Sequence, residues 1–271
     1  MKILITGAGG FVGKNLIAQL SNIRDGKANN YAVDKELEIL EYDIDTDPAL
    51  LDTYTAQCDF VFHLAGVNRP ENPEEFMTGN FGFTSVLLDK LKEHKNTAPV
   101  LITSSIQALL DNPYGASKKA GEDLLLEYSK ETGAKVLIYR LPNVFGKWCR
   151  PNYNSAVATF CNNIATGLDI QVNDPTVNMQ LVYIDDVVDE FIGSLTGAEH
   201  MEDGYCFIPT VHRVRLGEIV DLLYAFKNSR TTLSVPYLKD GFQKALYSTY
   251  LSYIPITEFS YPLKMNVDDR G

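Results

Sequence analysis

The opening of the chain, an apolar run followed at once by closely spaced glycines, restricts the fold more than any other feature of the sequence. Residues 2–6 are mostly apolar and have the length of a strand, and TGAGGFVG then places Gly7, Gly10 and Gly13 three residues apart. Apolar residues next recur with helical spacing. Such glycines allow a tight turn, close approach of the backbone to a pyrophosphate, and close packing of the helix on the strand. The pattern therefore predicts a strand–turn–helix unit that binds a dinucleotide at the helix N-terminus.

The first half of the chain continues this alternation of strands and helices. We predict further strands at 37–42, 59–64, 99–104 and 135–141, and helices at 10–22, 48–57, 72–94 and 113–132. This order is typical of a parallel sheet that is covered by helices on both faces. The sequence thus predicts an α/β protein with a Rossmann-type, doubly wound parallel sheet.

The spacing of apolar residues loosens after about residue 145. Helical patterns near 153–167, 184–196 and 215–227 mix there with strand-like runs such as 205–208. We interpret residues 1–145 as a dinucleotide-binding domain, and residues 146–271 as a smaller C-terminal substrate-binding lobe with the C-terminal segment. The lobe is expected to close over the carboxyl edge of the sheet, where ligands of open α/β sheets bind.

Charge and composition narrow the classes of partner. The chain has 24 Lys and Arg against 35 Asp and Glu, and its net charge of -11 would repel a phosphate backbone. We therefore expect no nucleic-acid partner, although a helix N-terminus and a few arginines can still hold a small anion. The chain opens in a strand and contains no apolar run of membrane-spanning length, which favours a cytoplasmic enzyme without membrane contact.

The cysteines and histidines do not indicate a metal centre. Cys58, Cys149, Cys161 and Cys206 are far apart, and the four histidines are scattered as well. Neither set has the paired spacing of a zinc or redox site. We expect reduced structural thiols and no metal.

Acidic residues at the end of the second predicted strand bear on the choice of cofactor. An acid at this place normally accepts hydrogen bonds from the adenosine ribose of a dinucleotide. Asp43 and Asp45 follow the strand, and a carboxylate at Asp43 would repel the 2′-phosphate of NADP(H), which favours NAD(H). The alternative is that both are solvated loop acids and that Arg24 or Lys35 folds over to accept NADP(H).

A second motif follows the fourth predicted strand. That strand ends in Ser104 and Ser105, and the segment NPYGASK then begins a helix with Asn112 as a good N-cap and proline in the first helical position. Tyr114 and Lys118, four residues apart, share one face of this helix. Tyrosine and lysine have the same spacing at 31 and 35, but without this context.

The spacing of Tyr114 and Lys118 has a chemical use. At an effective dielectric constant near 20, an ammonium about 5 Å away favours a phenolate by about 3 kcal/mol, or roughly two pKa units. We therefore expect a lowered pKa for Tyr114, which would make its phenol a general acid–base catalyst near neutral pH. The hydroxyl of Ser105, or of Ser104 as the alternative, would hold the substrate oxygen.

Taken in order, these motifs resemble a known family. TGAGGFVG, HLAGVNRP (63–70), ITSS, YGASK and RLPNVFG (140–146) resemble extended short-chain dehydrogenases/reductases of the NAD-dependent epimerase/dehydratase type, which act on nucleotide sugars. More specific stretches are DNPYGASK, FGKWCRPNYNS (145–155), ALYSTYLSY (245–253) and the closing NVDDRG. They resemble the N-terminal reductase domain of the bifunctional capsular-polysaccharide enzymes of the UDP-N-acetyl-L-fucosamine pathway. The resemblance covers almost the whole chain.

This resemblance implies an activity. Such domains use a nicotinamide cofactor to reduce a UDP-4-keto-6-deoxy-HexNAc to a UDP-2-acetamido-2,6-dideoxy-L-talose in the synthesis of capsule or O-antigen precursors. A following cupin domain carries a metal and epimerises C3 in these enzymes, and the present sequence stops where it would begin. We expect the reduction without the epimerisation. The resemblance implies NADP(H), whereas the local acids favour NAD(H), and analogy with extended members allows a homodimer formed through the helices at 72–94 and 113–132.

The resemblance also assigns roles to residues at matching positions. Catalysis is assigned to Ser105, Tyr114 and Lys118. Contacts with the cofactor are assigned, besides Asp43, to Gly7, Gly10, Phe11, Val12, Gly13, Leu64, Ala65, Gly66, Tyr114, Lys118, Pro142 and Asn143. Our candidates for binding the sugar and the UDP are Arg69, Lys147, Arg150, Asn154 and Ser155.

Two other functions fit the same fold. An epimerase would keep its nicotinamide cofactor bound while it oxidises and re-reduces one sugar, and a non-catalytic regulator would only bind the dinucleotide. Such regulators commonly lose the Tyr/Lys pair, which is intact here. A dehydratase would need an acid pair directly after the fourth strand, where Ile106 and Gln107 stand. We therefore favour a reductase, in which Tyr114 protonates the developing alkoxide.

Overall fold

The computed structural model describes residues 1–67, 72 and 74–260, which form two compact units. Of the described residues, the first unit comprises those within 1–144 and 182–211, and the second comprises 145–181 and 212–260. The predicted division near residue 145 agrees with the first boundary. Residues 182–211, which we had placed in the C-terminal lobe, belong instead to the first unit. They return to it because helix α7 (Ile184–Ser194) packs on helix α1 (Phe11–Arg24).

A parallel sheet forms the centre of the first unit. Its strands are β1 (Lys2–Thr6), β2 (Glu38–Tyr42), β3 (Phe60–His63), β4 (Val100–Ser105) and β5 (Val136–Leu141), in the order β2-β1-β3-β4-β5. β9 (Tyr205–Cys206) extends the sheet in parallel at β5, and β8 (Met201–Glu202) pairs with it antiparallel. All five predicted strands are confirmed, with ends shifted by at most one residue. The strand order reverses between β1 and β3, because β2 lies on one side of β1 and the later strands lie on the other. Ligands of open α/β sheets bind at such a switch point.

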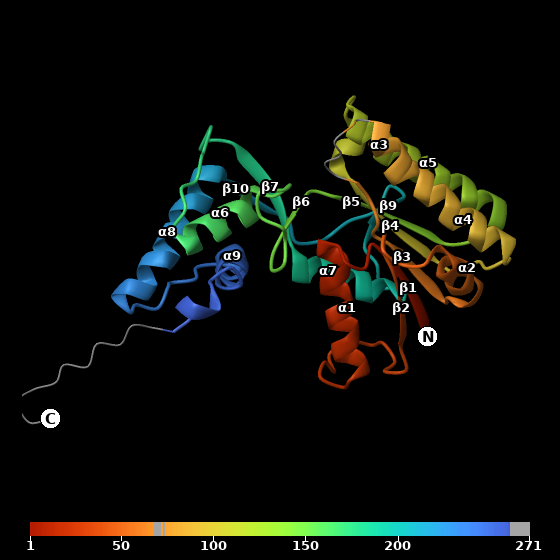
Figure 1. Ribbon diagram of the computed structural model, residues 1–271, viewed down its shortest axis with the longest axis horizontal. Helices are drawn as coiled ribbons and strands as arrows, with labels where there is room; N and C mark the ends of the chain where they lie inside the picture. The colour runs from red at the N-terminus through yellow and green to blue at the C-terminus, as the bar shows by residue number, and fades with distance from the viewer. Residues whose placement is uncertain (68–71, 73, 261–271) are drawn as a thin grey trace, which may run out of the picture. The chain divides into compact units, whose positions relative to one another are not determined.

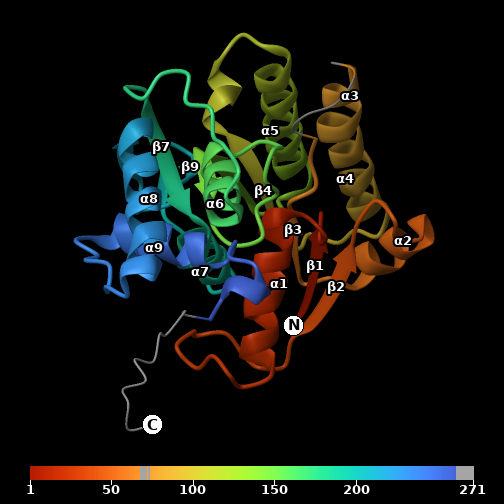
Figure 2. The ribbon, with the colours of Figure 1, turned by 60° about the vertical axis from the view of Figure 1, so that its left-hand side comes forward.

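The alternation of side chains along the strands builds a core on each face of the sheet. On β1, Ile3 and Ile5 are buried under α1 and α7, whereas Leu4 is buried on the opposite face. That opposite face is covered by α2 (Pro48–Gln57), α4 (Phe83–Glu93) and α5 (Pro113–Thr132), as Figures 1 and 2 show. The predicted doubly wound α/β fold is confirmed. The predicted bounds of the helices at 48–57 and 113–132 are those of α2 and α5.

The helix predicted at 72–94 is divided into three parts. A short α3 (Glu74–Phe76) continues as a π-helix, η1 (Met77–Gly82), and only then as α4. Asn80 lies within the π-helix, and its side chain pairs with the backbone of Val67: Oδ1 accepts from the amide N (2.9 Å) and Nδ2 donates to the carbonyl O (3.1 Å). This long-range pairing accompanies the widened turn, and π-helical turns are frequent at functional sites.

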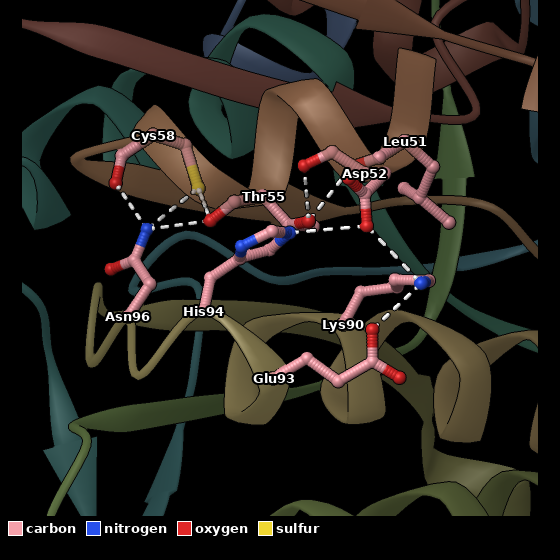
Figure 3. A network of polar contacts seen from close by, with 8 residues as sticks. All are labelled: Leu51, Asp52, Thr55, Cys58, Lys90, Glu93, His94 and Asn96. Atoms are coloured by element: carbon pink, nitrogen blue, oxygen red, sulfur yellow. Dashed lines mark hydrogen bonds and ion pairs between the residues drawn. The ribbon is translucent and has the colours of Figure 1, made fainter. Parts of the chain in front are cut away.

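A network of polar contacts, shown in Figure 3, fastens α2 to the segment that follows α4. The amide Nδ2 of Asn96 donates to the carbonyl oxygens of Thr55 (2.8 Å) and Cys58 (2.9 Å). Nearby, Lys90 of α4 forms an ion pair with Asp52 of α2 (3.1 Å), but both side chains are substantially exposed. Exposed pairs contribute little to stability, so the partly buried amide bonds are the stronger link. They hold the chain in place just before it enters β4.

The second unit contains three helices and part of a small sheet. Helices α6 (Ala156–Thr166), α8 (Leu216–Thr232) and α9 (Gly241–Leu251) pack on one another, and η3 (Ile256–Glu258) follows. The sheet has the order β10-β7-β6, from β6 (Asn143–Phe145), β7 (Asn178–Tyr183) and β10 (His212–Arg215). We did not predict α9, although its N-cap Asp240 and the four-residue spacing of its buried side chains indicate a helix. Across the described ranges, no helix is both long and apolar enough to cross a membrane.

Candidate active site

The glycine turn after β1 has the geometry that a bound anion requires. Gly7 has a φ of +72°, and its amide donates to the carbonyl oxygen of Tyr42 (2.9 Å). A Cβ at Gly13 would lie 2.2 Å from the Gly7 carbonyl oxygen, so only glycine lets the helix pack this closely. Helix α1 begins at Phe11 after Gly10, and no side chain within the described residues caps it. The amides of its first turn are therefore left for a ligand, which fits the pyrophosphate of a dinucleotide.

Asp43 lies directly beside this turn. It follows the last residue of β2, and its carboxylate accepts hydrogen bonds from the amides of Gly9 (2.6 Å) and Ile44 (2.7 Å). The structure thus brings together the glycine turn and the acid that the sequence analysis selected. A fixed negative charge at this place bears directly on which dinucleotide can bind.

The segment after β3 runs along the other side of the glycine turn. The amide of Leu64 donates to the backbone oxygen of Thr6 (3.0 Å), and the amide of Ala65 donates to Oγ1 of the same residue (3.4 Å). Below them, the ring of His63 bonds to Thr6 Oγ1 (2.7 Å) and to Thr84 Oγ1 (2.8 Å). Burial, with a smaller contribution from Lys118, lowers the pKa of His63 to about 3, so the imidazole is neutral and acts as a structural bridge. It holds the ends of β1 and β3 together.

The helix that carries Tyr114 is fixed at its start. The Asn112 side chain accepts from the amide of Gly115 (2.8 Å), and Pro113 occupies the first turn. A Cβ at Gly115 would lie 2.2 Å from the carbonyl oxygen of Gln107, so the helix start rests directly on the backbone of η2 (Ile106–Leu109). Because η2 continues from β4, Tyr114 is held at the carboxyl end of that strand.

Tyr114 is partly buried and is hydrogen-bonded to Ser105. Burial raises the pKa of Tyr114 above its usual value of 10, and the hydrogen bond to Ser105 offsets only part of this increase. The ammonium of Lys118 lies 5.8 Å from the centre of the Tyr114 ring. Our expectation of a lowered pKa for Tyr114 was therefore wrong in direction, because it left out the removal of the phenolate from water. At neutral pH the group is a protonated phenol.

Lys118 lies at a small pocket near the carboxyl end of β4. Its Nζ donates to the carbonyl oxygen of Thr103 (3.3 Å), and a Cβ at Gly66 would lie 3.1 Å from it. Burial lowers the pKa of Lys118 to about 8, whereas the charge of Glu122 raises it. The pocket is lined by Ala65, Asn80, Thr84, Ile102, Thr103, Ser104, Ser117, Lys118 and Gly121. The lysine is thus close to the segment expected to lie under the dinucleotide.

The two serines that end β4 have different partners. Ser105 is hydrogen-bonded to Tyr114 and also accepts from the Gln107 amide (3.2 Å). Ser104 instead donates to the buried carboxylate of Glu122 (2.6 Å). The geometry therefore puts Ser105 next to the phenol and engages Ser104 with a structural carboxylate.

Comparison with known proteins identifies the family of the chain. The model of the family described as "NAD dependent epimerase/dehydratase family" matches residues 3–204. The chain belongs to this family. The resemblance drawn from the motifs is thereby confirmed, and the residues that form the glycine turn, Ser105, Tyr114 and Lys118 all fall within the matched range. The family's name states its nicotinamide cofactor, NAD.

Individual relatives cover most or all of the chain. A Pseudomonas aeruginosa protein named UDP-2-acetamido-2,6-beta-L-arabino-hexul-4-ose reductase is 44% identical over 100% of this chain and 70% of its own length. The crystal structure of the capsular polysaccharide assembling protein CapF from Staphylococcus aureus is 50% identical, with a TM-score of 0.88, and likewise covers 100% of this chain and 70% of its own. The structure of a UDP-glucuronic acid 4-epimerase from Bacillus cereus in complex with NAD is 20% identical, with a TM-score of 0.72, and covers 93% of this chain and 98% of its own. At this identity the likeness supports the fold alone.

Further predicted contacts of this family member lie near the same edge of the sheet. Pro142 follows Leu141, which is paired in register with Ser105, and Asn143 is the next residue. Phe11 and Val12 form the start of α1 and pack against the core under the sheet. Their contacts with a cofactor stay predictions. Within the described residues, no group of three or more His, Cys, Asp or Glu side chains could hold a metal ion, and the four cysteines are buried and unpaired.

The predicted substrate residues that are described all lie in the second unit. Lys147 and Arg150 stack on their neighbours Trp148 (5.8 Å) and Tyr153 (5.3 Å). Ser155 caps α6 by accepting from the Ala158 amide (3.2 Å), so its oxygen already has a structural task. The remaining two are Asn154, which directly precedes this cap, and Arg69, which lies outside the described residues. Their roles in substrate binding stay predictions.

Sequence reasoning missed two residues of the site. Asn80 connects the site to the π-helix, because its Nδ2 also donates to Ser117 Oγ (3.0 Å) on α5. Nothing local in the sequence indicates this contact. Glu122 is the second, and here a signal existed: it lies four residues after Lys118, and therefore on the same face of the helix.

Proposed function

We propose that this protein is a nicotinamide-dependent reductase that converts the C4 ketone of a UDP-4-keto-6-deoxy-HexNAc into the alcohol of a UDP-2-acetamido-2,6-dideoxy-L-talose-type sugar. The proposal is carried by Tyr114, which is hydrogen-bonded to Ser105 and has Lys118 one helical turn away. It is supported by the 44% identity to a reductase whose name describes a 4-ketosugar nucleotide.

The protonation states suit reduction. The dinucleotide, when bound, supplies the hydride that reaches C4. Because burial raises the pKa of Tyr114, the phenol holds its proton at neutral pH and can donate it to the oxygen of the ketone as negative charge develops there. Ser105 donates a hydrogen bond to the same oxygen in this proposal. The ammonium of Lys118 then stabilises the phenolate that remains.

We infer that the protein prefers NAD(H). The carboxylate of Asp43 is held at the glycine turn by two backbone amides, and a fixed negative charge there disfavours a 2′-phosphate. The fit of a dinucleotide to this turn rests on Gly7, Gly13 and the uncapped start of α1, and both cofactors share the pyrophosphate bound there.

The UDP part of the substrate is assigned to the second unit. Lys147 and Arg150 supply positive charge for the diphosphate, and Asn154 and Ser155 supply polar groups, while Arg69 is a further candidate outside the described residues. A cytoplasmic location and a homodimer formed through the segments 72–94 and 113–132 complete the proposal by analogy with extended members of the family.

The decisive experiment supplies the purified protein with the UDP-4-keto sugar and either NADH or NADPH. We expect consumption of the reduced cofactor at 340 nm and a product with a C4 hydroxyl, identified by NMR. In the matched variant Tyr114→Phe, turnover is expected to fall by about 10³-fold, while the Kd for the cofactor changes less than about threefold, because only the acid is removed.

Other outcomes would identify the alternatives. Cofactor that stays bound in a one-to-one ratio and is not consumed, with interconversion of sugar epimers, would identify an epimerase. Binding of the cofactor and sugar without any turnover would identify a regulator. Near-normal turnover in Tyr114→Phe would refute the role of the phenol.

A further inference from the structure

Three successive turns on one face of α5 are bonded to the carboxyl end of β4. Tyr114 is hydrogen-bonded to Ser105, and Lys118 donates to a β4 carbonyl oxygen (3.3 Å). On the third turn, Glu122 accepts a hydrogen bond from Ser104 (2.6 Å). The regular spacing of four residues means that the helix face that carries the candidate catalytic pair is continued by a carboxylate. Two of these turns belong to the proposed chemistry, and the third has no part in it yet.

Glu122 is buried to an unusual degree for a carboxylate. Its exposed fraction is 0%, and Arg140 of β5 binds it with both arms, from Nε to Oε1 (2.9 Å) and from Nη2 to Oε2 (2.6 Å). The guanidinium of Arg140 stacks on the ring of Tyr205, 3.6 Å from its centre. Donors from β4 and β5 thus converge on one carboxylate of α5. A buried ion pair is weak support for stability as such, because removal of its charges from water offsets the attraction.

We propose that Glu122 is a positioning residue for the catalytic pair: its buried carboxylate fixes α5 on the end of β4 and keeps the side chain of Lys118 an ammonium while the substrate is reduced. Arg140 and Ser104 act through Glu122, by holding the carboxylate in place. This inference rests on the proposed reductase function for its purpose, but its physical content concerns only residues of the first unit.

The charges around Lys118 favour this assignment. His63 and Tyr114, two other titratable groups that face Lys118, are both neutral near pH 7 because burial lowers the pKa of the first and raises that of the second. Burial also lowers the pKa of Lys118 to about 8, and Glu122 raises it. Without the carboxylate the lysine would lose its proton at a still lower pH. The ammonium would then be absent under the conditions in which the phenolate has to be stabilised.

The protonation of Lys118 can be measured without turnover. Lysine labelled with ¹³C at Cε is incorporated into the full chain, and the signal of Lys118 is assigned with Lys118→Arg. The titration midpoint is expected near pH 8 in the unchanged protein. In Glu122→Gln, which keeps the shape and loses the charge, it should fall by one to two pH units, the shift expected for one charge at about 6 Å and an effective dielectric constant near 20.

Arg140→Gln is the matched control, since it breaks the same ion pair from the other side. The carboxylate then remains without its counter-charge, and the Lys118 midpoint is expected to rise. If the contact matters only for packing, both variants lose stability alike and move the midpoint in the same direction or not at all. Because a single buried charge can prevent folding, the neutral pair Glu122→Gln with Arg140→Gln gives a third measurement. Its midpoint is expected to fall by less than in Glu122→Gln, because the loss of Arg140 offsets part of the loss of Glu122.

The outcomes separate this inference from the reductase assignment. A shift of less than about 0.3 pH units in the double variant, or a fall in Arg140→Gln, would overturn the role of Glu122. In turnover assays, the pH at which kcat declines should move down together with the NMR midpoint in Glu122→Gln. The Lys118 midpoint could fall in Glu122→Gln and rise in Arg140→Gln while the protein reduces no UDP-4-keto sugar. This result would leave the electrostatic role of Glu122 intact and refute the proposed function.

Discussion

Replacing Lys118 by methionine should reveal how much stability the first unit gives up to keep an ammonium beside Tyr114. Burial lowers the pKa of Lys118 from 10.5 to about 8. Each pKa unit corresponds to about 1.4 kcal/mol, so the folded state disfavours the charged form by about 3 kcal/mol relative to the unfolded chain. Methionine has a similar length and no charge, and Lys118→Met is therefore free of this penalty.

The sign of the pH dependence follows from proton binding. Below pH 8 the lysine is charged in both states, and the folded protein bears the full penalty. Between pH 8 and 10.5 the folded state has released its proton while the unfolded state still binds it, so the free energy of unfolding rises with pH. Activity should change in the opposite direction, since kcat depends on the ammonium and is expected to fall as the pH rises through about 8.

Urea unfolding of the unchanged protein and of Lys118→Met between pH 7 and 10 would test this reasoning. Other tyrosines, lysines and cysteines titrate in both proteins, and only the difference in unfolding free energy between them is interpreted. That difference should shift by about 2 to 3 kcal/mol in favour of the unchanged protein as the pH rises. A difference that stays constant within about 0.5 kcal/mol would show that Lys118 is not desolvated as the structure implies.

Two further predictions concern residues that the sequence left ambiguous. Ser105→Ala should lower kcat about 100-fold, by loss of a donor to the developing alkoxide. Ser104→Ala should retain at least about a tenth of kcat and lose about 1 to 3 kcal/mol of stability in urea unfolding. The reverse pattern would exchange the roles of the two serines. The Kd measured by fluorescence should be lower for NADH than for NADPH. Asp43→Asn should reduce the ratio of the NADPH Kd to the NADH Kd about tenfold or more, because one carboxylate near a phosphate dianion in water contributes about 1 kcal/mol per charge. Equal affinities in the unchanged protein would contradict the assignment.

The elements that local patterns define were predictable. Asn112 and Pro113 mark the start of a helix by capping and by a fixed φ, and α5 begins where they predict. The π-helix within 72–94 was not predictable in this way. Its irregular turn accompanies the pairing of Asn80 with Val67, and such a pairing depends on how distant segments meet rather than on the periodicity of one segment.

The same division applies to the site. Spacing alone put Tyr114 and Lys118 on one helix face, and the glycine pattern gave the turn. The choice between Ser104 and Ser105 could not be made in this way, because neighbouring residues on a strand point in opposite directions and only the docking of α5 decides which of them meets the phenol. Likewise, the return of residues 182–211 to the first unit depends on the packing of α7 against α1.

The error in the predicted pKa of Tyr114 has an instructive cause. A charge at a known spacing can be read from a sequence, whereas the removal of that charge from water cannot, and here the second effect is larger. Burial favours the neutral form of both partners, so it raises the pKa of Tyr114 and lowers that of Lys118. For a reductase the first shift is useful, since the phenol must hold its proton until the alkoxide forms, but the second works against catalysis. A carboxylate placed one turn further along the same face opposes only the second shift, which gives Glu122 a role that neither its burial nor its ion pair with Arg140 would require for stability alone.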